Sequence, residues 1–157
     1  MIQSPEELEA LAWSAYYADD YRLAFRLFLR LAMGGNAEAQ LQVGLMFDDG
    51  EGVRQNYELA ARWYRTAAEQ GCAQAQFNLA ICYQKGEGVP QEPASAVAWY
   101  RRAAQLGHAH AQFELGLLYE RGTGVARDRA RAVHWYRLAA AQEVGSAVAR
   151  LSVLLGR

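Results

Sequence analysis

A tryptophan–tyrosine pair recurs at a constant interval of 36 residues, beginning at positions 63, 99 and 135. Two further series keep this interval: a Gly-x-Gly-Val motif that begins at positions 50, 86 and 122, and an alanine pair that begins at positions 67, 103 and 139. Self-similarity with a period of about 20–50 residues is typical of stacked repeat arrays. A single short unit cannot bury its apolar face alone, so we expect contacts between neighbouring units to stabilise the chain.

Each unit is predicted to contain two helices joined by the glycine-containing turn. Helix A spans about 37–49, 73–85 and 109–121, where apolar residues recur at helical spacing, as in Ala39, Val43 and Phe47. Helix B spans about 57–70, 93–106 and 129–142. The N-cap positions of helix B hold Asn56, Glu92 and Asp128. The tryptophan and tyrosine of each helix B are expected to fill the large spaces of the core, and the alanine pairs allow close helix contacts.

The two ends of the array depart from this pattern. Residues 4–36 form a degenerate first unit, in which a capping box at Ser4 begins a helix that runs to about Tyr17, and residues 21–33 match helix B. Residues 145–157 repeat helix A as a C-terminal capping helix. We therefore predict a single all-α repeat domain of about eight antiparallel helices, with full units at 37–72, 73–108 and 109–144.

Three segments of the first full unit resemble the Sel-one-like repeat family, a branch of the tetratricopeptide superfamily with a longer turn. They are Ala37-Glu-Ala-Gln-Leu-Gln-Val-Gly44, Gly50-Glu-Gly-Val53 and Ala60-Ala-Arg-Trp-Tyr-Arg-Thr-Ala-Ala68, closed by Gly71. The resemblance covers about residues 37–144, and a weaker tetratricopeptide-like match covers 5–36. It implies a right-handed α-solenoid whose helices A line a concave surface. It also implies a non-enzymatic adaptor that holds a protein partner.

The chain departs from this family pattern at two positions. Ala80 stands where the other units have Gly44 and Gly116, which is a mild change at a close helix contact. Glu143 replaces the glycine that follows helix B in the other units, so we expect the last junction to be built differently.

Composition excludes several classes of function. Sixteen basic and 17 acidic residues give a formal net charge of -1, which argues against a nucleic-acid partner. No segment approaches the ~18 consecutive apolar residues of a membrane span. The first seven residues have neither a basic nor an apolar stretch typical of a secretory signal, so we expect a cytoplasmic protein, although a secreted chain without its signal would look the same. Cys72 and Cys82 are expected to be two reduced thiols, about 15 Å apart if they share one helix, with Cys82 on an apolar face.

The candidate partner-binding surface is the face of helix A that points away from Ala39, Val43 and Phe47. It contains an apolar column of Leu41, Phe77 and Phe113, for which exposure and burial remain equally open. Burial between successive helices is the favoured interpretation for Leu45, Ile81 and Leu117. The charged and polar edge of this surface runs from acidic to basic through Glu38, Asp48, Asp49, Gln74, Gln84, Lys85, His110, Glu120 and Arg121. An apolar stripe beside an edge whose charge changes from acidic to basic is suited to binding a peptide or a helix.

No catalytic, cofactor-binding or metal-binding residues are predicted. Residues two apart on a helix point to nearly opposite sides, so His108 and His110 do not form a ligand pair, and no Cys or carboxylate completes a set. His134 is expected to lie at the surface. The glycine turns follow helices and lack the strand that precedes a dinucleotide-binding loop.

Arginines on helix B are interpreted as a solvated face, with an acidic partner as the alternative. They are Arg62, Arg65, Arg101, Arg102, Arg131 and Arg137.

Three hypotheses of function remain. The first is a non-enzymatic scaffold that binds a peptide or helix in the concave groove. The second is a self-associating element, because the C-terminal helix is apolar and carries few charges besides Arg150 and Arg157. The third is a hydrolase acting on β-lactams, by analogy with cysteine-rich secreted relatives, but the chain lacks their paired cysteines.

Overall fold

A computed structural model describes residues 4–156, which fold into nine α-helices without a strand. The helices are α1 (Pro5–Tyr17), α2 (Tyr21–Met33), α3 (Ala37–Asp49), α4 (Tyr57–Glu69), α5 (Ala73–Lys85), α6 (Pro93–Gln105), α7 (Ala109–Arg121), α8 (Arg129–Ala141) and α9 (Gly145–Leu155). The predicted helix ranges agree with these bounds to within one residue. The count exceeds the predicted eight by one, because the N-terminal pair and α9 add three helices to the six of the full units. Arg157 lies outside the described residues.

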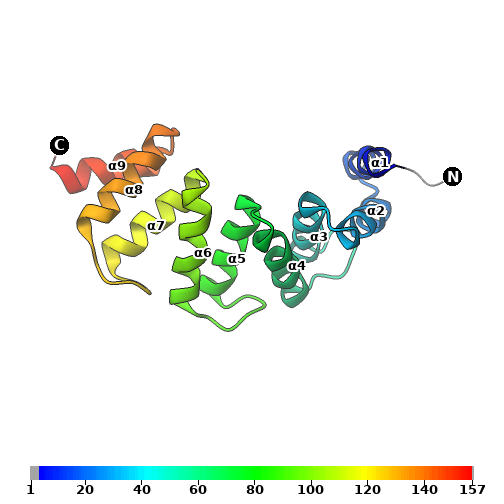
Figure 1. The fold of residues 1–157 in the computed structure, drawn as a ribbon, viewed down its shortest axis with the longest axis horizontal. Coiled ribbons are helices and arrows are strands. Elements are labelled where there is room, and N and C mark those ends of the chain that lie inside the picture. Colours follow the sequence, from blue (N-terminus) through cyan, green and yellow to red (C-terminus); the bar gives the residue numbers. More distant parts are fainter. Residues whose placement is uncertain (1–3, 157) are drawn as a thin grey trace.

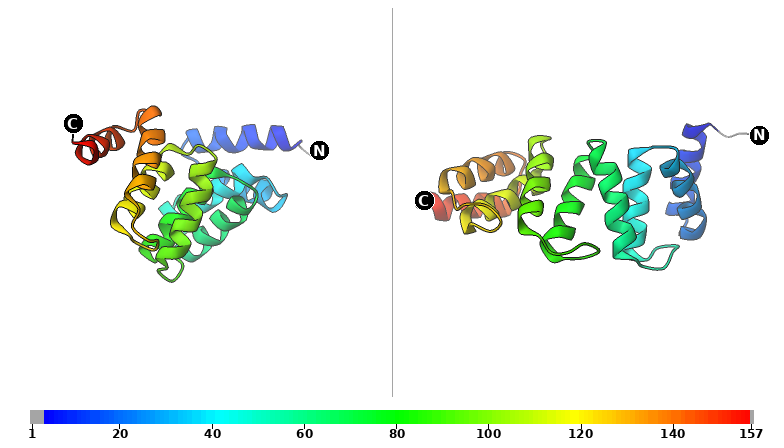
Figure 2. Two further views of the ribbon diagram at one scale, coloured as in Figure 1. Left: turned by 60° about the vertical axis from the view of Figure 1, so that its left-hand side comes forward. Right: turned by 60° about the horizontal axis from the view of Figure 1, so that its bottom comes forward.

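The helices follow one another in an arched row, with α1 and α9 at opposite ends of the row (Figure 1). Two further views show that the row also twists along its length (Figure 2). Each helix makes its main contacts with the helices directly before and after it in the chain. Helices α1, α3, α5, α7 and α9 take the place of helix A, and α2, α4, α6 and α8 take the place of helix B. The all-α solenoid predicted from the repeat is therefore confirmed.

Tyrosines and alanines form the repeated core. Tyr64, Tyr100 and Tyr136 are fully buried, as are the alanines that follow them on helix B, Ala67, Ala103 and Ala139. A side chain at Gly44 would meet the Tyr64 ring at 2.7 Å, so the missing Cβ makes room for that ring. Ala80 occupies the same position in the next unit and is completely buried, as is Tyr100. The tryptophans before the tyrosines are half-buried and pack against the edge of the core, so the expectation that both residues fill the core holds fully for the tyrosines only.

The glycine turns also join each unit to the unit before it. The second glycine of each turn lies against backbone atoms at the start of the preceding helix B: Gly52 against Tyr21, Gly88 against Tyr57 and Gly124 against Pro93. Val53, Val89 and Val125 are half-buried, so the turn valines do fold inward.

The last junction is built like the others, and the prediction that it differs was wrong. Glu143 adopts a left-handed φ of 65°, in the region where Gly71 has 91°. The amide of Val144 donates to the carbonyl of Ala139, as the amide of Cys72 donates to that of Ala67. Glu143 therefore holds a conformation that a side chain disfavours.

Over the part of the chain that the structure describes, no helix is long and apolar enough to cross a membrane.

Candidate functional site

Helices A leave one face uncovered, which we call the helix A stripe. It consists of three residues on each of three helices: Glu38, Leu45 and Asp49 on α3, Gln74, Ile81 and Lys85 on α5, and His110, Leu117 and Arg121 on α7. Their spacing of i, i+7 and i+11 places them on one side of each helix. The central apolar residue is half-buried in all three helices, and the residues on both sides of it are exposed.

The structure buries both apolar columns proposed from the sequence at least in part. Leu41 is buried, with 5% of its surface exposed, and its equivalents Phe77 and Phe113 are half-buried against Tyr100 and Tyr136, with ring centroids 5.7 Å apart in each pair. Leu45, Ile81 and Leu117 are also half-buried and pack against the core, with part of each side chain open, so the favoured burial is met in part. The two columns differ clearly only on α3, where Leu41 is buried and Leu45 is half-buried.

One row of the predicted edge is occupied by contacts within the chain. The Tyr64 hydroxyl donates to Asp48 Oδ2 at 2.9 Å. The hydroxyls of Tyr100 and Tyr136 donate in the same way to Gln84 at 2.6 Å and to Glu120 at 2.5 Å. Burial, followed by the Asp48 charge, raises the pKa of Tyr64 far above its ordinary value. Asp48, Gln84 and Glu120 therefore fix the ends of buried tyrosines, and a partner would compete with those bonds.

The exposed rows of the stripe change charge along the array. One row runs from Asp49 to Lys85 and Arg121, and the other runs from Glu38 to Gln74 and His110. Lys85 lies 3.8 Å from Glu87 in an exposed ion pair. Partial burial, then the neighbouring charges of Asp48 and Glu51, raises the pKa of Asp49. The α3 end is therefore negative and the α7 end positive.

The stripe continues onto helices that the sequence did not assign to it. When α1 is aligned with α3, Trp13 and Tyr17 fall at the positions of Leu45 and Asp49. Their rings stack at 5.8 Å, and Tyr17 keeps 78% of its surface exposed. Val153 of α9 occupies the equivalent position at the other end and is 72% exposed. The first unit has a shorter turn, so the interval of 36 residues did not reveal Trp13 and Tyr17.

His108 and His110 lie closer together than predicted. His108 is the N-cap of α7 and not a helical residue, and its ring centroid lies 6.3 Å from that of His110. Its Nδ1 accepts a hydrogen bond from the Ala111 amide, and its Nε2 lies 3.0 Å from Gln74 Oε1. The Phe77 ring stacks on the imidazole at 4.6 Å. The prediction that the two histidines point to opposite sides was wrong, but Nδ1 of His108 is occupied by the helix cap.

No group of three or more His, Cys, Asp or Glu side chains gathers around a possible metal position within residues 4–156. Cys72 and Cys82 are free thiols, half-buried and buried, as predicted. Burial raises the pKa of Cys82 to about 12, so this thiol is not a reactive nucleophile.

The arginine column on helix B is only partly a solvated face. Arg65 donates to the Tyr83 hydroxyl, and Arg101 donates to the Tyr119 hydroxyl at 3.1 Å. Arg131 reaches the same Tyr119 oxygen at 3.3 Å. Burial alone would raise the pKa of Tyr119, but the two guanidinium donors outweigh it and lower that pKa. The interpretation as a solvated face therefore fails for Arg65 and Arg101, which are half-buried, and holds for exposed Arg137.

Three buried glutamines were not singled out from the sequence. Gln40, Gln76 and Gln112 each donate to the carbonyl of the alanine eight residues earlier, at 3.1–3.2 Å. In two units the oxygen of this glutamine accepts from a second glutamine at the end of helix B: Gln70 donates to Gln40 at 2.7 Å and Gln142 to Gln112 at 2.9 Å. Leu106 stands at that position in the middle unit, and Gln76 Oε1 is buried without a partner.

These features define the class of the molecule: an α-solenoid built from helix pairs, with an open face along helices A. Residues 16–36, 37–72, 73–108 and 109–144 each match the Sel1 repeat. The chain therefore belongs to the Sel1 repeat family, as its motifs indicated. Proteins with this repeat are generally protein-interaction scaffolds.

Two solved structures are similar in both sequence and fold. A Sel1 repeat protein from Oxalobacter formigenes is 37% identical, with a TM-score of 0.88 over 92% of this chain and 60% of its own. The protective antigen c5321 of uropathogenic Escherichia coli, which has an SLR fold, is 35% identical, with a TM-score of 0.92 over 96% of this chain and 33% of its own. The present chain thus spans less than two thirds of the length of either protein.

The cysteine-rich protein B of Helicobacter pylori shares the fold with a TM-score of 0.67 at 19% identity, over 84% of this chain and 95% of its own. A search of the curated proteins found no match.

Proposed function

We propose that this chain is a non-enzymatic scaffold that binds a peptide or helix of a partner protein across the helix A stripe, in the concave groove of the arch. The observation that carries the proposal is the stripe itself: an apolar centre at Leu45, Ile81 and Leu117 between two exposed rows that both change from acidic to neutral or basic. An amphipathic segment that crosses these helices would cover the apolar centre.

The two charged rows specify how the partner segment would lie. Its basic residues would face Asp49 and Glu38 on α3, and its acidic residues would face Lys85 and Arg121 on α5 and α7. No cation lies within 4.0 Å of the carboxylates of residues 48, 49 and 51 in the part of the chain described here. A basic side chain of the partner would therefore neutralise a negative end that the chain leaves open.

The test is selection from a peptide library displayed on phage, followed by measurement of the affinity of each selected peptide. Peptides with acidic residues should lose at least about fivefold in affinity for the double variant Lys85→Glu, Arg121→Glu. The matched control is Arg26→Glu, Arg137→Glu, which reverses two exposed charges on helices B and should bind like the wild type. Equal binding to all three proteins would refute the proposed site.

The exposed face of α9 favours a second candidate function, association of two copies through this helix. Only Ala147 of α9 is buried, whereas Val148 and Leu155 are 50% and 42% exposed on the side that helix B covers in the other units. A second α9 would cover this face. Light scattering should show dimers that the double variant Val148→Glu, Leu155→Glu converts to monomers. A wild-type chain that stays monomeric at every concentration contradicts this candidate.

A further inference from the structure

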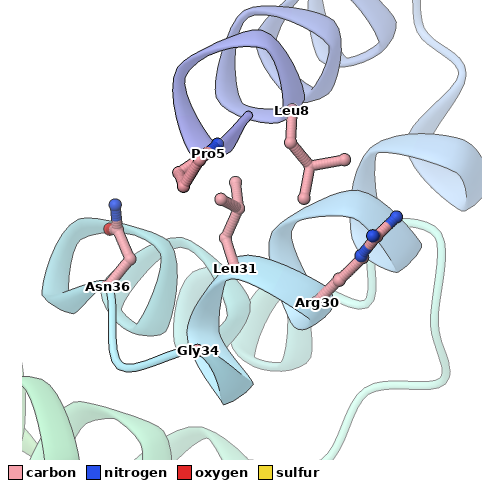
Figure 3. Close-up of a pocket in the computed structure, with 6 residues that line it drawn as sticks. All are labelled: Pro5, Leu8, Arg30, Leu31, Gly34 and Asn36. Atoms are coloured by element: carbon pink, nitrogen blue, oxygen red, sulfur yellow. The ribbon is translucent and has the colours of Figure 1, made fainter. Parts of the chain in front are cut away.

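A small pocket lies at the N-terminal end of the row, between α1, α2 and the start of α3 (Figure 3). Its volume is about 230 Å³. Pro5 and Leu8 of α1 face Leu31 of α2 across the pocket, with Arg30 on one side and Asn36 on the other. Binding sites for small molecules commonly occupy about 300–1,000 Å³. The space is therefore suited to one side chain more than to a cofactor or metabolite.

The repeat explains why the space is open. Gly34 follows α2 at the position where Gln70 follows α4 and Gln142 follows α8. In those units the glutamine side chain reaches back to a glutamine of helix A, as Gln70 does to Gln40 at 2.7 Å. Leu8 takes the place of Gln40 when α1 is aligned with α3. Gly34 lines the pocket and adds no side chain to it.

The chemistry of the walls indicates what would fill it. Pro5, Leu8 and Leu31 give the pocket carbon-rich walls, in place of the amide of Gln40. An aliphatic side chain would make dispersion contacts with all three walls and would leave no polar group unpaired.

Arg30 supplies the second determinant. It is exposed, and no carboxylate within residues 4–156 lies in salt-bridge distance of its guanidinium. A guanidinium binds a carboxylate through two parallel hydrogen bonds. A residue that carries an aliphatic side chain and a free carboxylate, as a C-terminal leucine does, would satisfy both the walls and this charge.

We propose that this pocket is an anchoring site for a leucine-like residue of a partner protein, with an adjacent carboxylate bound by Arg30. The site lies apart from the helix A stripe and does not depend on it. It would hold a partner by one buried side chain at the end of the array.

The probe for this site is N-acetyl-L-leucine, added to the full chain with ¹³C-labelled leucine methyl groups. The Leu8 and Leu31 methyl signals should shift in a saturable way, with a Kd of roughly 1–10 mM for a ligand of this size. N-acetylglycine, which lacks the side chain, should cause no shift. N-acetyl-leucinamide, which lacks the carboxylate, should bind at least about fivefold more weakly, and the Arg30→Gln variant should weaken N-acetyl-L-leucine by a similar factor.

Replacing Gly34 with a larger residue should fill the pocket and abolish binding of N-acetyl-L-leucine. Gly34 has a φ of -77°, which any residue can adopt, so Gly34→Leu should fold and remove the methyl shifts. Gly34→Gln, which introduces the residue found at this position in two of the other units, is a second filled variant and should also remove the methyl shifts. Gly145→Leu, placed in open space at the other end of the row, is the matched control and should leave binding unchanged. The proposal is overturned if the wild type shows no saturable shift at Leu8 and Leu31, or if a folded Gly34 variant binds like the wild type.

The variant Lys85→Glu, Arg121→Glu should bind the probe normally, so a failure of the stripe and a failure of this pocket can be told apart.

Discussion

A Cβ atom on Gly88 would lie 2.0 Å from the carbonyl oxygen of Tyr57, the first residue of the preceding helix B. Real Cβ atoms do not approach backbone oxygens this closely. The glycine is therefore required by the contact between two units as well as by its left-handed φ of 72°.

Replacing Gly88 with alanine should destabilise the chain by about 3 kcal/mol or more, because both the turn and α4 must move apart. Gly107→Ala is the matched control, since Gly107 has a φ of 89° but nothing within 4 Å of its missing Cβ. It should cost only about 1 kcal/mol for the conformation. Urea denaturation of both variants measures the difference. Similar losses would show that the turn adjusts easily and does not clamp the units together.

Replacing Leu106 with glutamine should stabilise the chain by about 1 kcal/mol. The new amide can donate to Gln76 Oε1, which is buried without a partner, as Gln70 donates to Gln40. Leu106 is 57% exposed, so little apolar burial is lost. Leu106→Glu has the same shape but no donor, and it should give no gain in the same urea titration. If the glutamate stabilised the chain as much as the glutamine, the gain would come from replacing an exposed apolar side chain and not from this hydrogen bond.

Replacing Glu143 with glycine should stabilise the chain by roughly 0.5–1 kcal/mol, because glycine adopts the left-handed φ of 65° without steric cost. Glu143→Ala removes the charge but keeps the unfavourable conformation, so it should leave the melting temperature close to that of the wild type. If alanine and glycine had the same effect, the charge and not the backbone would be the cause.

Stability should fall in mildly acidic solution through His108. Burial, and then the neighbouring His110, lowers the pKa of His108 from its ordinary 6.5, so the folded chain favours the neutral ring. The contribution is complete above pH 6.5 and is lost as the pH falls from there through the folded-state pKa. Protonation of Nδ1 removes the cap of α7, which is worth about 1 kcal/mol.

The control for this pH dependence is His108→Asn, which keeps a cap like that of Asn36 but does not titrate. Melting temperatures recorded between neutral and mildly acidic pH should converge for the two proteins at neutral pH and separate below it. Parallel curves would assign the pH dependence to other groups.

Much of the fold could be predicted from the sequence because the repeat supplies each signal three times. Helix bounds follow from such repeated signals, including the Asn56 and Asp128 caps, whose side chains accept from the amides of Leu59 and Arg131. Glu92, in the same position, makes no such bond, as its longer side chain suggests. The Glu143 junction was predicted wrongly because local preference favoured another turn, whereas packing of α8 against α9 imposes the shared one.

The candidate surface was harder to predict. Helical spacing identifies which residues share one face of a helix, but it does not identify which neighbouring helices cover that face. Leu41 and Leu45 are four residues apart on one helix, and only the position of the neighbouring helices decides which is open. The bonds from Tyr64 and Tyr136 to Asp48 and Glu120 could have been found, since a polar residue precedes each buried tyrosine by 16 positions. The pocket at Gly34 could not, because the first unit is out of register with the rest.

The docking of each turn onto the unit before it has a consequence for how such chains change length. At Tyr21 and Tyr57 the atoms nearest to the docked glycine all belong to the backbone, so the contact depends little on which side chains are present. Loss of residues 73–108 would bring Gly124 against Tyr57 in place of Pro93. The same contact between a turn glycine and the start of the preceding helix B would then form. In-frame duplication or deletion of one unit therefore preserves this backbone contact, so genes of this kind can lengthen and shorten by whole units without losing it.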